Sequence, residues 1–411
     1  MHRSLFLLGL WGYCMGCAAR TGSGAAPAQV RPGIDVLLTD SLSLVRNRRI
    51  GLVTNQSGID ANGKRDLDRL VGAGLRVTAV FAPEHGLSGT VDVDQAPDSR
   101  QERDSATGIP VYLLHDGVRL HPPTATMLEQ VDVLLVDLQD TGARYYTYPA
   151  AVATIMQAAG RLPVVVLDRP NPIGGAVQGD VQDSVTASAV ARFPIAMRHG
   201  MTIGELAHLA KTTLGLGADL HVVPLDGWRR SMSFDATGLP FVPPSLNLRT
   251  LESLYHYPGL CLFEGTNLSV GRGSEWPFEQ IGAPWLDTTA MLAVLRRGSP
   301  PGVTFSAARF MPHGPGDGKY PDTLLAGIRL TTTDRSVYDP TVTAVHLLSA
   351  LKQTHPEAFA FRRPQFDRLA GGPDLRTAIE RGESVSAIAA RWREELKRFR
   401  DRRRAYLLYP E

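Results

Sequence analysis

A glutamate and a histidine stand side by side at positions 84 and 85, directly after the apolar run from Val77 to Phe81. A run of this length between helix-like segments is typical of a buried parallel strand. Pro83 cannot continue the hydrogen-bond ladder and Gly86 permits an unusual turn, so both polar side chains should lie just beyond the strand's carboxyl end. There Glu84 and His85 would be placed for proton transfer, although an ordinary polar loop tip could carry the same residues.

Other apolar runs end in polar side chains in the same way. The runs at residues 50–54, 131–136 and 164–167 read as short strands, and helix-like segments follow them. Strands that alternate with helices predict a parallel sheet with right-handed crossovers, and ligands bind at the carboxyl edge of such sheets. The polar residues expected to gather along that edge are Asn55, Glu84, Asp137, Asp140, Asp168 and Asn171.

Acidic residues with aromatic neighbours favour glycoside hydrolysis. A glycosidase needs one acid to protonate the leaving oxygen, and usually a second carboxylate as base or nucleophile. Glu84 is the expected acid, and the second group is left open among Asp137, Asp140, Asp168 and Glu264. The side chains that could stack on sugar faces are Tyr145, Tyr146, Trp276 and Trp285, of which we expect at least two to pack in the core instead.

Arginines and histidines in the predicted site loops allow two further kinds of contact. One or two of the arginines could clamp a substrate carboxylate through parallel hydrogen bonds, and a structural ion pair is an equally good interpretation for each. These arginines are Arg144, Arg169, Arg198 and Arg272. The histidines show none of the usual metal-ligand spacings, so we expect no metal site, although His85, His115 and His199 could converge in space.

Composition and missing motifs argue against several classes of function. The net charge is +2, from 43 basic and 41 acidic residues, which gives no electrostatic case for nucleic acid as a partner. No glycine-rich phosphate loop opens a helix, so we expect no nucleotide cofactor, and we expect no other cofactor. The G-x-S-x-G elbow of ordinary serine esterases is absent as well.

The chain is long enough for two hydrophobic cores, with 411 residues of which 43% are hydrophobic. A proline-rich extended segment at 238–249 predicts a boundary near residue 250, between domains at 33–250 and 251–411. In the second domain an apolar run at 260–263 is expected to be a strand, and it should deliver Glu264, Asn267 and Arg272 to the site. The polar stretch at 92–108 is expected to be a long loop over the site.

The first residues read as an export signal. A short basic start precedes the apolar run from Leu5 to Leu10, and a Gly-Cys pair ending at Cys17 resembles a bacterial lipoprotein cleavage site. Cys14 stands where such sites usually have leucine, so the match is imperfect. We expect a signal peptide at 1–19, a lipid on Cys17 and a flexible tether at 20–32. No other segment has the roughly 18 apolar residues of a membrane span, so a lipid anchor in the periplasm or cell envelope would be the one contact with the membrane.

Nine long motifs carry a resemblance to a known family. Four of them are VTNQSG at 53–58, FAPEHGL at 81–87, DLQDTGARYYTY at 137–148 and LDRPNPIGG at 167–175. The others are RHGMTIGELA at 198–207, GWRR at 227–230, LPFVPPSLNL at 239–248, LFEGTNLSVGRG at 262–273 and GAPWLD at 282–287. Together they resemble the exo-β-N-acetylmuramidase family, known earlier as a domain of unknown function, and the similarity spans essentially the whole chain after Gly33.

The resemblance implies a fold and an activity. The fold would be a Rossmann-like parallel-sheet domain joined to a smaller C-terminal α+β domain, with the active site in the cleft between them. The activity would be removal of terminal β-1,4-linked N-acetylmuramic acid from the non-reducing end of peptidoglycan fragments, during turnover and recycling of the cell wall. The lactyl carboxylate of that sugar gives the site arginines a target, and the loops around Trp276 and Trp285 could close one end of the pocket.

The resemblance also implies site residues. We take Glu84, His85 and Asp168 as catalytic, with Glu84 as the family's catalytic acid. The substrate-binding residues would be Asn55, Asp137, Asp140, Arg144, Tyr146, Arg169, Asn171, Glu264, Asn267 and Arg272. Two departures from the family pattern are Ser88, where Arg or Lys is frequent, and SLNL at 245–248, where SPNMP is frequent. Both could alter the affinity for substrate.

Some alternatives stay open at this point. Retention, inversion and attack by the substrate's own acetamido group are all compatible with the sequence, and the separation of the two carboxyl groups would decide between the first two. A monomer and a homodimer fit equally well. A different class of function, a non-catalytic muropeptide-binding lipoprotein of the cell envelope, would keep the same fold and cleft.

Overall fold

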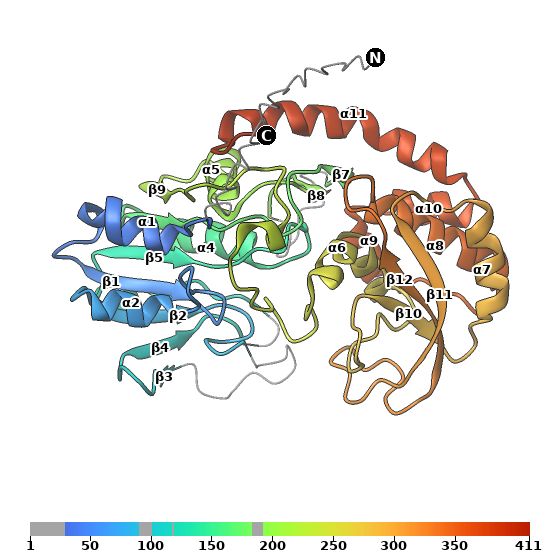
Figure 1. The fold of residues 1–411 in the computed structure, drawn as a ribbon, viewed down its shortest axis with the longest axis horizontal. Coiled ribbons are helices and arrows are strands. Elements are labelled where there is room, and N and C mark those ends of the chain that lie inside the picture. The colour runs from blue at the N-terminus through green and yellow to red at the C-terminus, as the bar shows by residue number, and fades with distance from the viewer. Residues whose placement is uncertain (1–28, 90–100, 117–118, 183–191) are drawn as a thin grey trace, which may run out of the picture.

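The computed structural model describes residues 29–89, 101–116, 119–182 and 192–411, which form two units joined side by side (Figure 1). The first unit contains strands β1–β9 and helices α1–α5, and the second contains β10–β12 and α6–α10. The predicted signal peptide, Cys17 and residues 20–28 of the predicted tether lie outside the described residues. No helix in the described part of the chain is long and apolar enough to cross a bilayer.

The first unit is built on a seven-stranded sheet with the order β3-β4-β2-β1-β5-β6-β9. Neighbouring strands are parallel except for β3 and β4 at one edge. The strands are β1 (Arg49–Thr54), β2 (Arg76–Ala82), β3 (Gln101–Arg103), β4 (Pro110–Leu113), β5 (Val133–Asp137), β6 (Val164–Leu167) and β9 (Leu220–Val223). The predicted α/β fold with a mostly parallel sheet is confirmed.

Helices cover both faces of this sheet (Figure 1). They are α1 (Gly33–Asp40), α2 (Asp66–Gly72), the short α3 (Ala125–Leu128), α4 (Tyr148–Ala159) and α5 (Ile203–Thr213). Leu52 shares a buried cluster with α1 and α2, whereas its neighbour Val53 shares one with α4 and α5. Successive residues of a strand point to opposite faces, so a sheet covered on both sides needs continuous apolar strands, as the sequence shows.

The second unit is a three-stranded antiparallel sheet with helices packed around it. The sheet order is β10-β12-β11, formed by β10 (Gln280–Ala283), β11 (Val303–Phe310) and β12 (Leu325–Thr332). The helices are α6 (Leu251–Leu260), α7 (Thr288–Arg297), α8 (Pro340–Thr354), α9 (Arg363–Ala370) and α10 (Asp374–Glu380). This arrangement confirms the smaller unit with both helices and strands that the resemblance implied.

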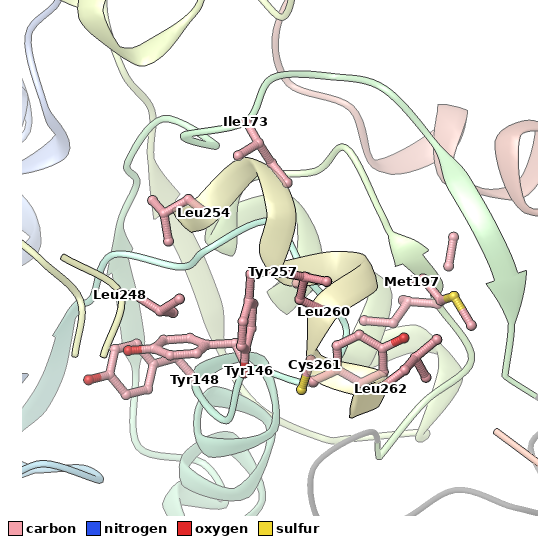
Figure 2. Packing of buried hydrophobic residues seen from close by; sticks show 14 of the residues in the cluster. Tyr146, Tyr148, Ile173, Met197, Leu248, Leu254, Tyr257, Leu260, Cys261 and Leu262 are labelled. Carbon is pink, nitrogen blue, oxygen red and sulfur yellow. The ribbon is translucent and has the colours of Figure 1, made fainter. Parts of the chain in front are cut away.

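The two units share one hydrophobic core. The buried cluster that contains Val152 of α4 also contains Leu254 of α6 and Leu347 of α8. Figure 2 shows part of it, where Tyr146 lies beside Tyr257 of α6, with 6.4 Å between the ring centroids. Burial of this apolar surface holds the two units together.

The chain returns to the first unit after completing the second. Helix α11 (Val385–Arg403) runs back across both units (Figure 1) and packs beside the small antiparallel pair β7 (Gln178–Val181) and β8 (Ala196–Arg198). Beyond it, the Tyr409 hydroxyl donates a 2.5 Å hydrogen bond to Asp168 and accepts one of 2.9 Å from the Leu225 amide. Residues after α11 therefore complete the core of the first unit.

Three local predictions need correction. The run at 260–263 is not a strand, because α6 ends at Leu260 and a 3-10 turn follows at Cys261–Gly265. A fully buried helical segment lacks polar periodicity, so it cannot be distinguished from a short strand by pattern. Within the stretch predicted as a loop, residues 101–103 form β3, and residues 90–100 lie outside the described residues. The predicted tether does not extend to residue 32, because Val30 is buried and its amide donates a 3.0 Å hydrogen bond to Thr237.

Candidate active site

A cavity of about 790 Å³ lies where the two units meet. Its walls come from the turn after β2, the end of β4, α4, the turn after α6, and α9. Small-molecule sites typically enclose about 300–1,000 Å³, so the cavity can hold a sugar. The lining residues that carry charge or can transfer protons are Glu84, His85, His115, Arg119, Arg192, Glu264, Arg272, Asp317 and Arg368.

Glu84 lies at the carboxyl end of β2 in a turn that its neighbours hold in place. Thr147 Oγ1 donates a 2.6 Å hydrogen bond to Oε2 of Glu84, and the Tyr148 hydroxyl donates one of 3.4 Å to the main-chain carbonyl of Glu84. His85 has φ +74°, in the left-handed region that non-glycine residues rarely adopt. Such strain persists only where the surroundings enforce it, and here it places both side chains on the cavity wall.

Asn55 does not line the cavity, and it is connected to Glu84 through Tyr148. Its Nδ2 donates a hydrogen bond to the Tyr148 hydroxyl, and its Oδ1 accepts one of 2.9 Å from the Ser57 amide. Burial raises the pKa of Tyr148, so its hydroxyl keeps the proton that it donates to the Glu84 carbonyl. Asn55 therefore supports the turn that carries Glu84.

His115 extends this wall from the end of β4. Burial lowers the pKa of His115, and the nearby His85 lowers it further, against the opposing effect of the Glu84 and Asp116 carboxylates. The imidazole is therefore neutral at pH 7 and can accept or donate a proton beside Glu84.

The facing wall carries Glu264, in the turn after α6. Its Oε1 accepts a 2.6 Å hydrogen bond from Nε of Arg272, and the Cys261 thiol lies 3.6 Å from its Oε2. Burial raises the pKa of Cys261, so the thiol is protonated and acts as the donor. Arg272 Cζ also lies 5.1 Å from the centre of the Phe278 ring, so both members of the Glu264–Arg272 pair are fixed at the cavity surface.

Lys319 holds the turn that presents Glu264. Its ammonium group is buried and donates to the carbonyls of Phe263 (3.1 Å), Glu264 (3.1 Å) and Leu268 (2.8 Å). Burial lowers the pKa of Lys319 to about 8 from the ordinary 10.5, partly offset by Asp317. The Phe263 carbonyl also accepts hydrogen bonds from the amide and the hydroxyl of Thr266, so the carbonyls of Glu264 and Leu268 are the two that depend most on Lys319.

The activity of this site is expected to decline as the pH rises through about 8, because Lys319 then loses a proton and one carbonyl of the Glu264 turn loses its donor. Between about pH 8 and 10.5 the folded state binds fewer protons at this group than the unfolded state, so Lys319 makes stability rise with pH. The decline would therefore report the local turn rather than unfolding. The measurement is kcat/KM from pH 7 to 9.5 for the natural protein, Lys319→Met and the exposed control Lys397→Met. A decline of the same shape in Lys319→Met would contradict this assignment.

Most of the acids predicted along the sheet edge do not line the cavity. Asp137 forms a buried ion pair with Arg169, with Nη2 of Arg169 3.0 Å from Oδ2 of Asp137. Asp140 Oδ2 lies 3.2 Å from Nε2 of His199, in a pair that is also buried. These residues stabilise the turns after β5 and β6, and their expected contact with substrate is not seen in their positions.

Asp168 is fully buried and lies away from the cavity. Its Oδ2 accepts hydrogen bonds from the hydroxyls of Thr202 (2.7 Å) and Tyr409 (2.5 Å), and its Oδ1 accepts one of 2.8 Å from the Gly204 amide. Burial raises the pKa of Asp168 to about 7. These contacts join β6 to α5 and to the returning chain, and they leave no oxygen exposed to a sugar.

The remaining predicted binding residues divide in the same way. Tyr146 and Arg272 line the cavity, and the Tyr146 hydroxyl donates a 2.7 Å hydrogen bond to the carbonyl of Pro244. Asn171 and Asn267 bind main-chain atoms elsewhere, at 2.9 Å to Met201 and 2.8 Å to Ala358 respectively. The guanidinium of Arg144 donates hydrogen bonds to the main-chain carbonyls of Asp180 and Leu369, and that of Arg198 donates one to the carbonyl of Ile173.

The aromatic wall differs from the expected one. Trp276 stacks on the guanidinium of Arg329 and Trp285 packs against His355, so neither closes the cavity. Tyr145 and Tyr146 do line the cavity, and they are joined there by two aromatic residues that pattern analysis missed, Tyr257 and Phe278.

Sequence reasoning also missed several polar residues of the cavity. Thr147 lies inside the DTGARYYTY motif, and its position just before a helix could have signalled a partner for Glu84. Arg192, Arg368 and Asp317 lie outside every motif, and no local pattern marks them. Among the described residues, no group of three or more His, Cys, Asp or Glu side chains is arranged to hold a metal ion.

Comparisons with known proteins cover nearly the whole chain. The family model described as exo-beta-N-acetylmuramidase NamZ, N-terminal, matches residues 50–252, and its C-terminal counterpart matches residues 255–409. The peptidoglycan beta-N-acetylmuramidase NamZ of Bacillus subtilis (strain 168) is 41% identical over 390 residues, which are 94% of this chain and 92% of that protein.

Two crystal structures of DUF1343 family proteins from Bacteroides fragilis have the same fold. One is 29% identical with a TM-score of 0.83, covering 93% of this chain and 99% of that one. The other is 30% identical with a TM-score of 0.75, covering 93% of this chain and 100% of that one.

Proposed function

The chain belongs to the exo-β-N-acetylmuramidase NamZ family, and we infer from this membership that it is an exo-acting glycoside hydrolase of peptidoglycan. It releases terminal N-acetylmuramic acid from the non-reducing end of peptidoglycan fragments. The observation that carries this conclusion is a sugar-sized cavity with Glu84 on its wall, between the two halves that match the family models. The non-catalytic alternative is not favoured, because the Bacillus subtilis relative is an enzyme.

Glu84 is the proposed general acid. Its carboxyl group protonates the glycosidic oxygen while the bond from that oxygen to the anomeric carbon breaks. The hydrogen bond from Thr147 to Oε2 fixes the plane of the carboxyl group and leaves Oε1 for this transfer. His85 and His115 lie on the same wall as Glu84.

Glu264 is the proposed second carboxylate. It lies on the facing wall and is held by Arg272, where it can stabilise the positive charge that develops at the anomeric carbon. Asp317 is the remaining acid on the described cavity wall. Proton NMR of the first sugar anomer released would separate retention from inversion, and an oxazoline trapped from the substrate would identify attack by its acetamido group.

Purified protein is expected to release the chromophore from a chromogenic β-N-acetylmuramide, and EDTA should leave the rate unchanged. Measurable binding of the same compound without release would support the non-catalytic muropeptide-binding protein instead. Complete loss of activity in EDTA, restored by a divalent cation, would indicate a metal site that includes His85 and His115.

We propose that the enzyme is exported and acts in the periplasm or cell envelope, where its substrate is found. The support is the leader sequence, in which an apolar run precedes the Gly-Cys pair ending at Cys17. Metabolic labelling with a palmitate analogue should mark the natural protein and not Cys17→Ser, and labelling of both would move the anchor elsewhere. The protein acts as a monomer or a homodimer, and sedimentation equilibrium would distinguish the two.

A further inference from the structure

The cavity extends away from Glu84 along helix α4. Thr147, Ala151, Thr154 and Gln157 all line it, at the spacing of one helical face. The seven helical steps from Thr147 to Thr154 span about 10 Å at the rise of an α-helix. The cavity is therefore longer than the reach of Glu84 and has a second end, which we call the distal end.

Arg192 lies at this distal end with its guanidinium already oriented. Nη1 donates a 2.7 Å hydrogen bond to the Thr154 hydroxyl, and Nη2 donates one of 2.8 Å to Oε1 of Gln157. Both partners are uncharged, and no described residue forms an ion pair with Arg192. A half-buried cation fixed by neutral groups keeps its charge available for a ligand.

Arg368 lines the same cavity from the second unit. It lies on α9, one helical turn after Gln365, and both residues line the cavity. Arg144 links the segment after Arg368 to the segment after Arg192. Its Nη2 donates a 3.1 Å hydrogen bond to the carbonyl of Leu369, and its Nη1 lies 3.5 Å from the carbonyl of Ile195, three residues after Arg192. No hydrogen bond or ion pair joins the Arg368 side chain to the described part of the protein.

Charge is distributed unevenly along the cavity. The acids Glu264 and Asp317 are matched by Arg272 and Lys319, with Nζ of Lys319 3.8 Å from Oδ2 of Asp317. Neither Arg192 nor Arg368 forms an ion pair with a described acid, and Asp180 lies 3.9 Å from Nη1 of Arg144. The geometry points to a carboxylate-binding subsite in which Arg192, with Arg368 on the wall of the same cavity, binds an anionic group of the substrate.

We assign this group to the lactyl carboxylate of the terminal N-acetylmuramic acid, an assignment that rests on the proposed function. The carboxylate is carried by the lactyl ether on C3, two ring carbons away from the anomeric carbon that Glu84 serves. A separation of about 10 Å along α4 fits one substituted pyranose between the two ends. The planar guanidinium can bind both carboxylate oxygens in parallel.

Calorimetric titration of three ligands tests this subsite independently of turnover. Arg192→Gln and Arg368→Gln should each weaken the binding of N-acetylmuramic acid. For Arg192→Gln the loss of affinity should be about tenfold to a hundredfold. Neither variant should change the affinity for the methyl ester of the same sugar, which lacks the charge. The exposed and remote Arg296→Gln should change neither affinity, and Arg192→Lys should recover part of the binding because it restores the charge.

The third ligand, N-acetylmuramoyl-L-alanyl-D-isoglutamine, distinguishes the source of the carboxylate. Its lactyl group is an amide, so its affinity should respond to Arg192→Gln no more than that of the ester does. If Arg192→Gln weakened the binding of this ligand as much as that of N-acetylmuramic acid, the subsite would bind a carboxylate of the stem peptide, and the lactyl assignment would be overturned. Equal weakening of acid and ester, or no weakening of either, would overturn the subsite itself. Hydrolysis of the chromogenic muramide by the natural protein reports separately on the proposed function.

Discussion

Glu84→Gln is expected to lose nearly all activity toward a β-N-acetylmuramide while the protein stays folded. Glutamine has the shape of glutamic acid and can still accept the hydrogen bond from Thr147, but it cannot protonate the leaving oxygen. Loss of a positioned general acid typically lowers the rate by about 10²–10⁴-fold. The measurement is kcat/KM on a substrate with a poor leaving group, such as the natural disaccharide.

A leaving group that needs no proton provides the sharper test of the same residue. With a dinitrophenyl glycoside the departing oxygen is stable as an anion, so Glu84→Gln should retain far more of its rate than with the disaccharide. The matched control is Glu357→Gln, which changes an exposed glutamate on the second unit. An unchanged rate in Glu84→Gln, or an equal loss on both substrates, would remove Glu84 from the role of acid.

The second large effect concerns stability. Glu205 and Arg230 form a fully buried ion pair, with Nη2 2.6 Å from Oε1 and Nη1 3.1 Å from Oε2. Glu205 also accepts hydrogen bonds from the amides of Thr202 (3.0 Å) and Leu408 (2.8 Å). Glu205→Gln leaves the buried Arg230 with only the exposed Glu411 carboxylate, 3.9 Å away, and loss of a buried partner typically lowers the free energy of unfolding by about 3–5 kcal/mol. Urea denaturation followed by circular dichroism measures the change.

Two further variants separate the buried charge from a general effect of mutation. Arg335→Gln breaks an exposed ion pair with Asp235, 3.0 Å long, and should change the free energy of unfolding by about 0–1 kcal/mol. The double variant Glu205→Leu with Arg230→Met removes both charges and should be more stable than Glu205→Gln alone. If Glu205→Gln were no more damaging than Arg335→Gln, the pair would not stabilise the fold as described.

The parts of the site that follow from local sequence were predicted well. An apolar run that stops at Pro83 predicts where β2 ends, and Glu84 lies at that end on the cavity wall. Asp168 also follows its strand as predicted, yet it is buried away from the cavity. Its hydroxyl partner Tyr409 comes from 241 positions further along the chain, and no local pattern can announce a partner so distant. The position of a residue at the end of a strand therefore predicts that it lies near the edge of the sheet. Whether its side chain is exposed to the cavity depends on packing with distant parts of the chain.

The distal end of the cavity shows the same limit. Arg192 and Arg368 stand in no motif and are separated by most of the second unit in sequence. They share a cavity because Arg144 binds the carbonyl that follows Arg368 and lies beside the segment that follows Arg192. Arg144 looks in sequence like a substrate clamp, but in the structure it binds main-chain carbonyls and lies 3.9 Å from the Asp180 carboxylate, so it links two segments of the cavity wall.

The return of the chain to the first unit has a consequence for biosynthesis. The Leu225 amide acquires its partner, the Tyr409 hydroxyl, only after 184 further residues have been made. Domains generally fold as their chains emerge, N-terminal part first, but this one must wait for a segment that follows its neighbour in the chain. A chain that stopped before Tyr409 would leave this amide without its partner, so the first unit gains its full set of contacts only when the last residues have been made.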